Sequence, residues 1–165
     1  EKGTTDNIIP YGTEAMAIMR IEKGHVAGGE LDGRTTPDDL GLNKLISSKK
    51  EFIGRRLLKR EGFIDPKRPK LVGLIPIDGK SRIRTGSILV KDPNASLPMP
   101  KLGHVSSGAY LSPTLKHPIS LGLITGGTDR IGETVWATSP LHGETNEVKI
   151  VDPVFYDKQG ERLNG

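Results

Sequence analysis

The sequence of 165 residues has no cysteine, few aromatic residues and no long apolar run. Without cysteine, neither disulfides nor thiolate metal sites can form, which is compatible with the cytoplasm, where we expect the protein to reside. No apolar stretch approaches the ~18 residues of a membrane-spanning helix. No positively charged segment followed by an apolar one marks a secretory leader. We therefore expect no membrane association and no disulfide framework.

The usual patterns of metal and catalytic sites are also missing. The four histidines lack the H-x-x-x-H or H-x-x-E-H spacing that would put two ligands on one face. There is no G-x-S-x-G elbow, no Walker-type loop and no cysteine nucleophile. The late glycines precede no helix, which argues against a dinucleotide-binding fingerprint. We expect neither a metal site nor a complete catalytic group in this chain.

Positive charge slightly exceeds negative charge, with a formal net charge of +4. The positive charge is concentrated between residues 49 and 70, where only Phe52 and Phe63 could stack on bases. Because nucleic-acid surfaces usually combine cations with stacking aromatic rings, we expect no nucleic-acid partner. A solvated basic face, or a surface that meets an acidic partner subunit or a polyglutamate tail, is the better interpretation.

The composition favours a turn-rich β structure in the second part of the chain. There are 21 glycines and 12 prolines, and from residue 65 onward short β-like runs alternate with them. Six such runs at mostly hairpin spacing predict an antiparallel β-barrel or jelly-roll-like domain over residues 65–165. The predicted strands span residues 70–77, 88–91, 102–109, 120–124, 134–138 and 147–150.

The first part of the chain predicts short helices, so the expected fold class is α+β. A helix should run from an N-cap at Thr13 to residue 23, apolar nearly all round and buried on most sides. Two further short helices are predicted, one following a capping box at residues 36–39 and one at residues 54–60, ended by Gly62. Residues 1–64 are interpreted as a helical remnant. Since the chain starts with Glu1 and enters a buried-looking helix early, we expect it to be a piece of a longer polypeptide.

Arg20 stands out because it places a permanent charge inside the apolar run of the first predicted helix. A guanidinium cannot lose its proton, so it needs an acid, a phosphate or several carbonyls as partners unless it reaches water. One interpretation is a structural ion pair, with Glu22 of a neighbouring segment or with another acid. The other is a ligand that carries a carboxylate. The residues alone leave both open.

Several ordered motifs resemble the glycine-cleavage aminomethyltransferase (T-protein) superfamily. In that superfamily a helix ending R-L-E-A-G precedes a glycine-rich loop, a T-T-P turn, a K-x-x-F-x-G segment and a late S-P-x-L motif. The similar residues here are 20–24 (R-I-E-K-G), 35–37 (T-T-P), 49–54 (K-K-E-F-I-G) and 112–115 (S-P-T-L). Within the superfamily, the sequence of these motifs most resembles the C-terminal part of the α subunits of heterotetrameric sarcosine oxidases, which are flavoenzymes.

This resemblance implies a role in folate binding. It implies that tetrahydrofolate lies in a hole shared with a preceding N-terminal part, and that Arg20 contacts it. Glu22, His25 and Tyr156 are the other candidate cofactor-binding residues, with His25 a substitute for a family tyrosine that is replaced by Gly28. The family's aspartate for methylene transfer and its pterin-gripping glutamate would lie upstream. The chain is therefore expected to be part of an oxidoreductase that is not catalytic alone.

The resemblance also implies cofactors and partners for a parent complex. FAD, FMN and NAD would sit elsewhere in it, and the rest of the α subunit and the other subunits would be partners. By the same resemblance, the complex would demethylate sarcosine and pass the one-carbon unit to tetrahydrofolate. Alternatives are part of a free-standing aminomethyltransferase and a non-enzymatic barrel that docks subunits through its basic face. Folate-binding iron–sulfur assembly relatives carry K-G-C-Y-x-G-Q-E, but residues 23–30 lack its cysteine.

Overall fold

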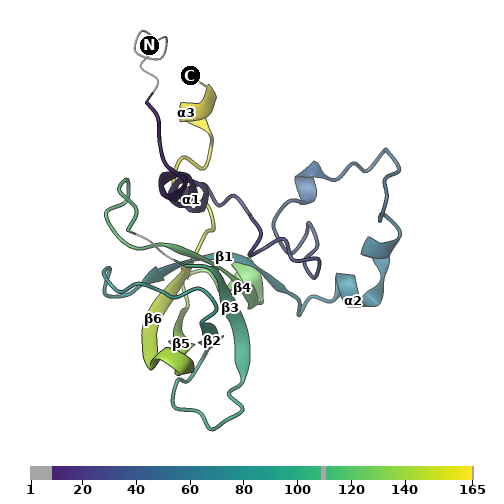
Figure 1. Ribbon diagram of the computed structural model, residues 1–165. Helices are drawn as coiled ribbons and strands as arrows, with labels where there is room; N and C mark the ends of the chain where they lie inside the picture. Colours follow the sequence, from purple (N-terminus) through teal and green to yellow (C-terminus); the bar gives the residue numbers. More distant parts are fainter. Residues whose placement is uncertain (1–8, 109–110, 165) are drawn as a thin grey trace.

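The structure is a closed antiparallel barrel with an N-terminal segment laid against it. The computed structural model describes residues 9–108 and 111–164 (Figure 1). The strands follow the order β1-β4-β3-β2-β5-β6 around the barrel, and neighbouring strands are antiparallel. Their bounds are β1 Pro69–Pro76, β2 Ile88–Val90, β3 Lys101–Ser107, β4 Ser120–Thr125, β5 Thr134–Ser139 and β6 Glu144–Val151. The predicted six-stranded antiparallel barrel is confirmed.

The barrel interior is filled by one face of each strand, because alternate side chains of a strand point to opposite sides. This interior core consists of Val72, Leu74, Ile83, Leu89, Val105, Ile124, Val135, Ala137, Val148 and Ile150. A second apolar cluster lies on the outside of β1 and β4, where Leu71, Leu121 and Leu123 pack against Ile21 and Leu40. The N-terminal segment is therefore anchored on the outer face of these two strands.

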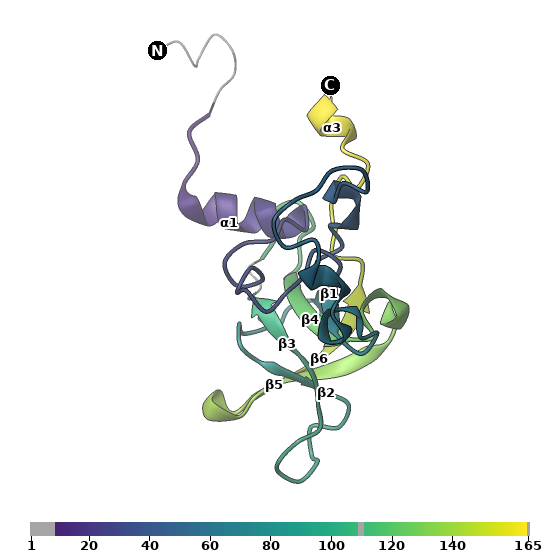
Figure 2. The same ribbon diagram turned by 90° about the vertical axis from the view of Figure 1, so that its right-hand side faces the viewer.

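Helix α1 (Thr13–Glu22) crosses one end of the barrel, as Figure 2 shows. The helix was correctly predicted, but Gly12 occupies the N-cap position, and no side chain caps the helix. The prediction that α1 is buried on most sides is wrong for the described residues. Met16 and Met19 are 53% and 45% exposed, and only Ile21 and Glu22 are buried. The reason is that only the last turn of α1 reaches the barrel.

The other short helices differ from their predictions. The capping box at residues 36–39 forms, since Thr36 N–H donates to Asp39 Oδ2 at 2.7 Å and Asp39 N–H donates to Thr36 Oγ1 at 3.3 Å. The chain then turns at Gly41, whose φ of 70° leaves the helical region, and only a 3₁₀ turn, η2 (Asn43–Leu45), follows.

A helix over residues 54–60 is also absent. This segment loops away from the barrel (Figure 1) and holds a 3₁₀ turn, η3 (Leu57–Lys59), before α2 (Glu61–Ile64), which contains Gly62 instead of ending at it. Short helices need an apolar face to bury, and Leu57 is exposed. The remaining short elements are η4 (Gly127–Arg130), η5 (Pro140–His142) and α3 (Glu161–Asn164). The division of the chain at residue 65 stays a prediction.

Candidate functional site

Arg20 lies in the last turn of α1 and is held by three hydrogen bonds. Nη1 donates to the His25 carbonyl oxygen at 3.1 Å and to Glu30 Oε2 at 3.3 Å, and Nη2 donates to Ser107 Oγ at 2.6 Å. The Glu30 side chain is fully buried, whereas that of Arg20 is 25% exposed. Arg20 is therefore tied to an internal acid and still reaches the surface.

Glu30 is the centre of this network. Its Oε1 accepts hydrogen bonds from Ser106 and Ser107 of β3, and its Oε2 accepts one from Ala27 N–H at 2.8 Å. Burial alone would raise the pKa of Glu30, but the two hydroxyls, the Ala27 N–H and the Arg20 charge together hold that pKa below its ordinary value. The carboxylate is therefore a charged, fully satisfied anchor.

The loop that carries Glu30 can approach β3 only because Gly29 has no side chain. A Cβ at Gly29 would lie 2.6 Å from the Ser106 carbonyl oxygen, inside van der Waals contact. The backbone contact brings Glu30 within reach of the two serines. A short side chain on the loop would therefore displace the partner of Arg20.

Glu22 fastens the end of α1 to the C-terminal part of the chain. Its buried carboxylate accepts hydrogen bonds from Ser112 and Thr114, the first and third residues of the S-P-T-L motif. Its carbonyl oxygen accepts hydrogen bonds from Phe155 N–H and Tyr156 N–H, each at 2.9 Å. The S-P-T-L motif therefore helps to hold in place the helix that carries Arg20.

The two other candidate residues, His25 and Tyr156, lie close to these contacts of Glu22. His25 is exposed and contacts Arg20 through its backbone carbonyl. Tyr156 is half-buried, and its ring lies 5.8 Å from the guanidinium carbon of Arg162. The structure thus gathers the four predicted residues around the end of α1, with Tyr156 joined through the Glu22 carbonyl. Whether they contact a cofactor stays a prediction.

The acid that pairs with Arg20 is Glu30 and not Glu22. Sequence reasoning left the pairing acid open and did not select Glu30, Ser106 or Ser107. One signal was present, because Glu30 fills the last position of the K-G-C-Y-x-G-Q-E pattern considered for residues 23–30. The serines offered no such signal, since Ser107 lies 87 residues after Arg20 in the sequence.

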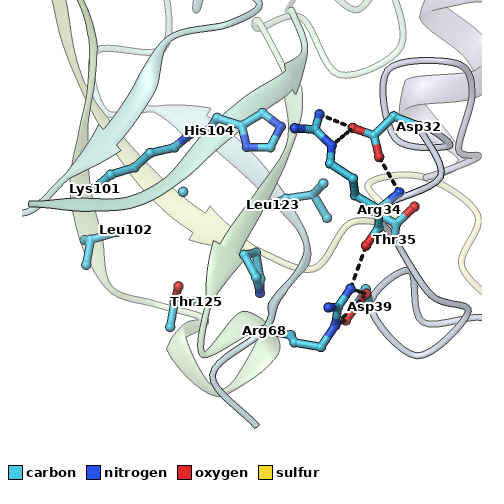
Figure 3. A pocket seen from close by; sticks show the side chains of 12 residues that line it. Asp32, Arg34, Thr35, Asp39, Arg68, Lys101, Leu102, His104, Leu123 and Thr125 are labelled. Carbon is cyan, nitrogen blue, oxygen red and sulfur yellow. Dashed lines mark hydrogen bonds and ion pairs between the residues drawn. The ribbon is translucent and has the colours of Figure 1, made fainter. Parts of the chain in front are cut away.

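A separate pocket lies between the loop at residues 31–39 and the outer face of β3 and β4 (Figure 3). It has a volume of about 380 Å³. Lys101 and His104 line it from β3, and Arg34 faces His104 from the loop. Burial, and then the charges of Lys101 and Arg34, lower the pKa of His104. Neutral His104 therefore sits in a locally positive environment.

Two ion pairs stabilise the loop side of the pocket. Arg34 pairs with Asp32. Arg68 binds the buried carboxylate of Asp39 with Nε at 3.0 Å from Oδ1, and donates to the Arg34 carbonyl oxygen at 2.7 Å. Among residues 9–108 and 111–164 no group of three or more histidine and acidic side chains is arranged to hold a metal ion. The same residues contain no helix long and apolar enough to cross a membrane.

Comparison with known proteins defines the class of this barrel. Residues 70–157 match the family model described as the glycine cleavage T-protein C-terminal barrel domain, and the chain belongs to this family. The fold agrees with a solved structure, the glycine cleavage system aminomethyltransferase T from Bartonella henselae. That structure has a TM-score of 0.64 and 21% sequence identity, covering 86% of this chain and 38% of the solved chain.

Among named proteins, the chain is similar to α subunits of sarcosine oxidase. It is 44% identical over 166 residues to the Rhizobium meliloti (strain 1021) subunit and 37% identical over 165 residues to that of Corynebacterium sp. (strain U-96). Each alignment covers 99% of this chain but 17% of the relative, so the chain spans about a sixth of those proteins. An aminomethyltransferase of Desulfitobacterium hafniense (strain Y51) is 32% identical, covering 97% of this chain and 41% of the relative.

Proposed function

We propose that the chain is the folate-binding end of a sarcosine oxidase α-like subunit, where it helps pass the one-carbon unit from sarcosine oxidation to tetrahydrofolate. The similarity to two sarcosine oxidase α subunits at 44% and 37% identity supports this choice over the aminomethyltransferase at 32%. In this proposal tetrahydrofolate touches the chain, while FAD, FMN and NAD belong to other parts of the complex. The rest of the α subunit and the other subunits are its partners.

The observation that carries the proposal is the geometry of Arg20. A guanidinium has five N–H donors, and the described residues accept from three of them. Nε and one hydrogen of Nη2 are left for a ligand, and the side chain is 25% exposed. Because Glu30 already compensates the charge, these donors suit a neutral pterin carbonyl as well as a carboxylate. A position held from three directions also loses little entropy on binding.

The other candidate residues have different roles in this proposal. Glu22 keeps α1 on the barrel, since its carboxylate is buried against Ser112 and Thr114. His25 is exposed beside Arg20 and is the nearest candidate for a second ligand contact. Tyr156 contacts Glu22 through its backbone, since Tyr156 N–H donates a hydrogen bond to the Glu22 carbonyl oxygen. No residue of the chain is assigned the transfer chemistry itself, which the proposal gives to the upstream part of the subunit.

The experiment is a calorimetric titration of tetrahydrofolate into the full-length complex. Arg20→Ala should weaken the affinity by about 2 kcal/mol, roughly thirtyfold, as expected for loss of charged hydrogen bonds. The matched control is Arg84→Ala, because Arg84 pairs with Glu144 away from α1 and is not part of the Arg20 network. Unchanged affinity in a folded Arg20→Ala complex would contradict the proposal.

A free-standing aminomethyltransferase is the second candidate, favoured by the 32% identity over 97% of the chain. The two candidates differ in the residues that precede this segment. An upstream G-x-G-x-x-G motif between a strand and a helix is expected for the oxidase-type subunit, as a dinucleotide-binding fingerprint. Oxidation of sarcosine by the purified complex, measured as product formation, distinguishes them directly.

A further inference from the structure

Strand β3 contains a β-bulge beside the Arg20 network. Val105 pairs with Gly122 of β4, but Ser107 pairs with the next residue, Leu121, so Ser106 is the extra residue of the bulge. Such a residue changes which side of the sheet the following side chain faces. Val105 belongs to the interior core, whereas Leu121 belongs to the outer cluster. Because paired residues point to the same side of a sheet, Ser107 faces outward with Leu121.

The bulge puts two consecutive hydroxyls on the outer face of the barrel. In a regular strand Ser107 would lie two residues after Val105 and would face the interior with it. Instead, Ser106 and Ser107 both donate to Oε1 of Glu30. Ser107 also accepts a hydrogen bond from Arg20 Nη2 at 2.6 Å. The Ser107 hydroxyl therefore joins the buried acid to the guanidinium.

The bulge is unfavourable for Ser120 on the neighbouring strand β4. Leu121 and Leu123 belong to the outer cluster, so alternation along β4 turns Ser120 to the interior. In a regular register Ser106 would pair with Leu121, and Ser107 would then lie opposite Ser120. In the part of the chain that the structure describes, Ser120 Oγ is buried without a hydrogen-bond partner. Because an unpaired buried hydroxyl is destabilising, the contacts that the bulge makes possible on the outer face offset this loss.

We propose that Ser107 is a positioning residue for the Arg20 site, and that the bulge at Ser106 is the device that puts it there. Glu30 and the His25 carbonyl oxygen both bind Nη1, so they leave the guanidinium able to turn about that nitrogen. The Ser107 hydroxyl binds Nη2, and this second point fixes the plane of the guanidinium and the direction of its remaining donors. The orientation of Arg20 follows from these contacts, whereas any effect on ligand affinity rests on the proposed function.

The first test is crystallography of the full-length protein without ligand. Ser107→Ala should release the Arg20 guanidinium from its single orientation, and Ser107→Thr, which keeps the hydroxyl, should restore it. Ser106→Ala is the matched control, because the Ser106 hydroxyl is also buried and binds Glu30 but makes no hydrogen bond to Arg20 among the described residues. An unchanged Arg20 orientation in Ser107→Ala would overturn the proposal. If Ser107→Ala does not fold, Ser107→Cys replaces the hydroxyl by a weak hydrogen-bonding group of similar size and decides the same question.

The second test is calorimetry of tetrahydrofolate with the full-length complex. Ser107→Ala should weaken binding about fivefold, and Ser106→Ala less than about twofold. Ser107→Thr should restore the affinity, and adding Ser107→Ala to Arg20→Ala should weaken binding no further. Equal losses for the two serine-to-alanine variants would overturn the proposal, because Glu30 alone would then set the position of Arg20. If Arg20→Ala leaves the affinity unchanged, the proposed function fails, and the crystal structures still decide whether Ser107 positions Arg20.

Discussion

The barrel and the N-terminal segment at residues 9–68 are stabilised in different ways. The barrel encloses ten buried apolar side chains in one interior core. In the N-terminal segment only Ile21 and Leu40 are buried apolar residues, while Leu45 and Ile53 are fully or largely exposed. The hydrophobic effect therefore accounts for most of the stability of the barrel but for only part of the docking of the segment, through the small cluster that Ile21 and Leu40 form with β1 and β4.

The segment is also attached to the rest of the chain through buried carboxylates. Glu22, Glu30 and Asp39 are each at least 95% buried, and hydroxyls, N–H groups or arginines satisfy them. Such groups contribute little net stability, but they are costly to disturb once buried and fix one geometry. A ligand-binding site needs such a fixed geometry, and the buried carboxylates provide it by holding the Arg20 side chain in place.

The largest expected effect lies in the barrel core. Leu74→Ala should reduce the free energy of unfolding by about 4 kcal/mol, because it leaves a cavity among fully buried side chains. The matched change Leu57→Ala, in the N-terminal segment, should cost less than about 0.5 kcal/mol, since Leu57 is exposed. Urea denaturation of both variants measures this. Similar losses of unfolding free energy in the two variants would show that Leu57 is packed as tightly as the barrel core.

An intermediate effect is expected where the segment meets the barrel. Asp39→Asn should destabilise the protein by about 3 kcal/mol, because it leaves Arg68 without its buried counter-charge. The control is the neighbouring Asp38→Asn, which removes a more exposed pair with Lys70 and should cost less than about 1 kcal/mol. Equal values for the two variants in denaturant titrations would mean that burial of Asp39 is unimportant.

The smallest effect concerns the acid that holds Arg20. Glu30→Gln should cost about 2 kcal/mol at pH 7, as expected when a charged acceptor of several hydrogen bonds is weakened. The pKa of Glu30 is lowered on folding, so its contribution is present above the ordinary glutamate pKa and is lost as the pH falls below it. The difference between wild type and Glu30→Gln should therefore shrink from pH 7 toward pH 3.

Thermal denaturation across this pH range measures the difference, with the exposed Glu51→Gln as control. A difference that stays constant down to pH 3 would contradict the role assigned to the Glu30 charge. It would also mean that the charge of Glu30 does not help to hold the N-terminal segment on the barrel.

Strand positions could be predicted because their signals are local. Short β-like runs between glycine and proline turns located all six strands within a few residues of their observed bounds, and Ala109, the predicted end of one strand, lies outside the described residues. The capping box at Thr36 and Asp39 was equally local and is present. The helix predicted at residues 54–60 failed because periodicity cannot tell whether a surface exists for Leu57 to pack against.

For this protein, the sequence by itself determined the barrel strands, the helix that ends near Arg20 and the need of that arginine for a partner. Only the tertiary structure decided that Glu30 is that partner and that Ser107 completes the contact. It also placed Lys101 and His104 opposite Arg34 in one pocket. The physical reason is range: strand and helix patterns depend on neighbours in sequence, whereas these contacts join segments whose approach is set by barrel closure and by packing of the loop at Gly29.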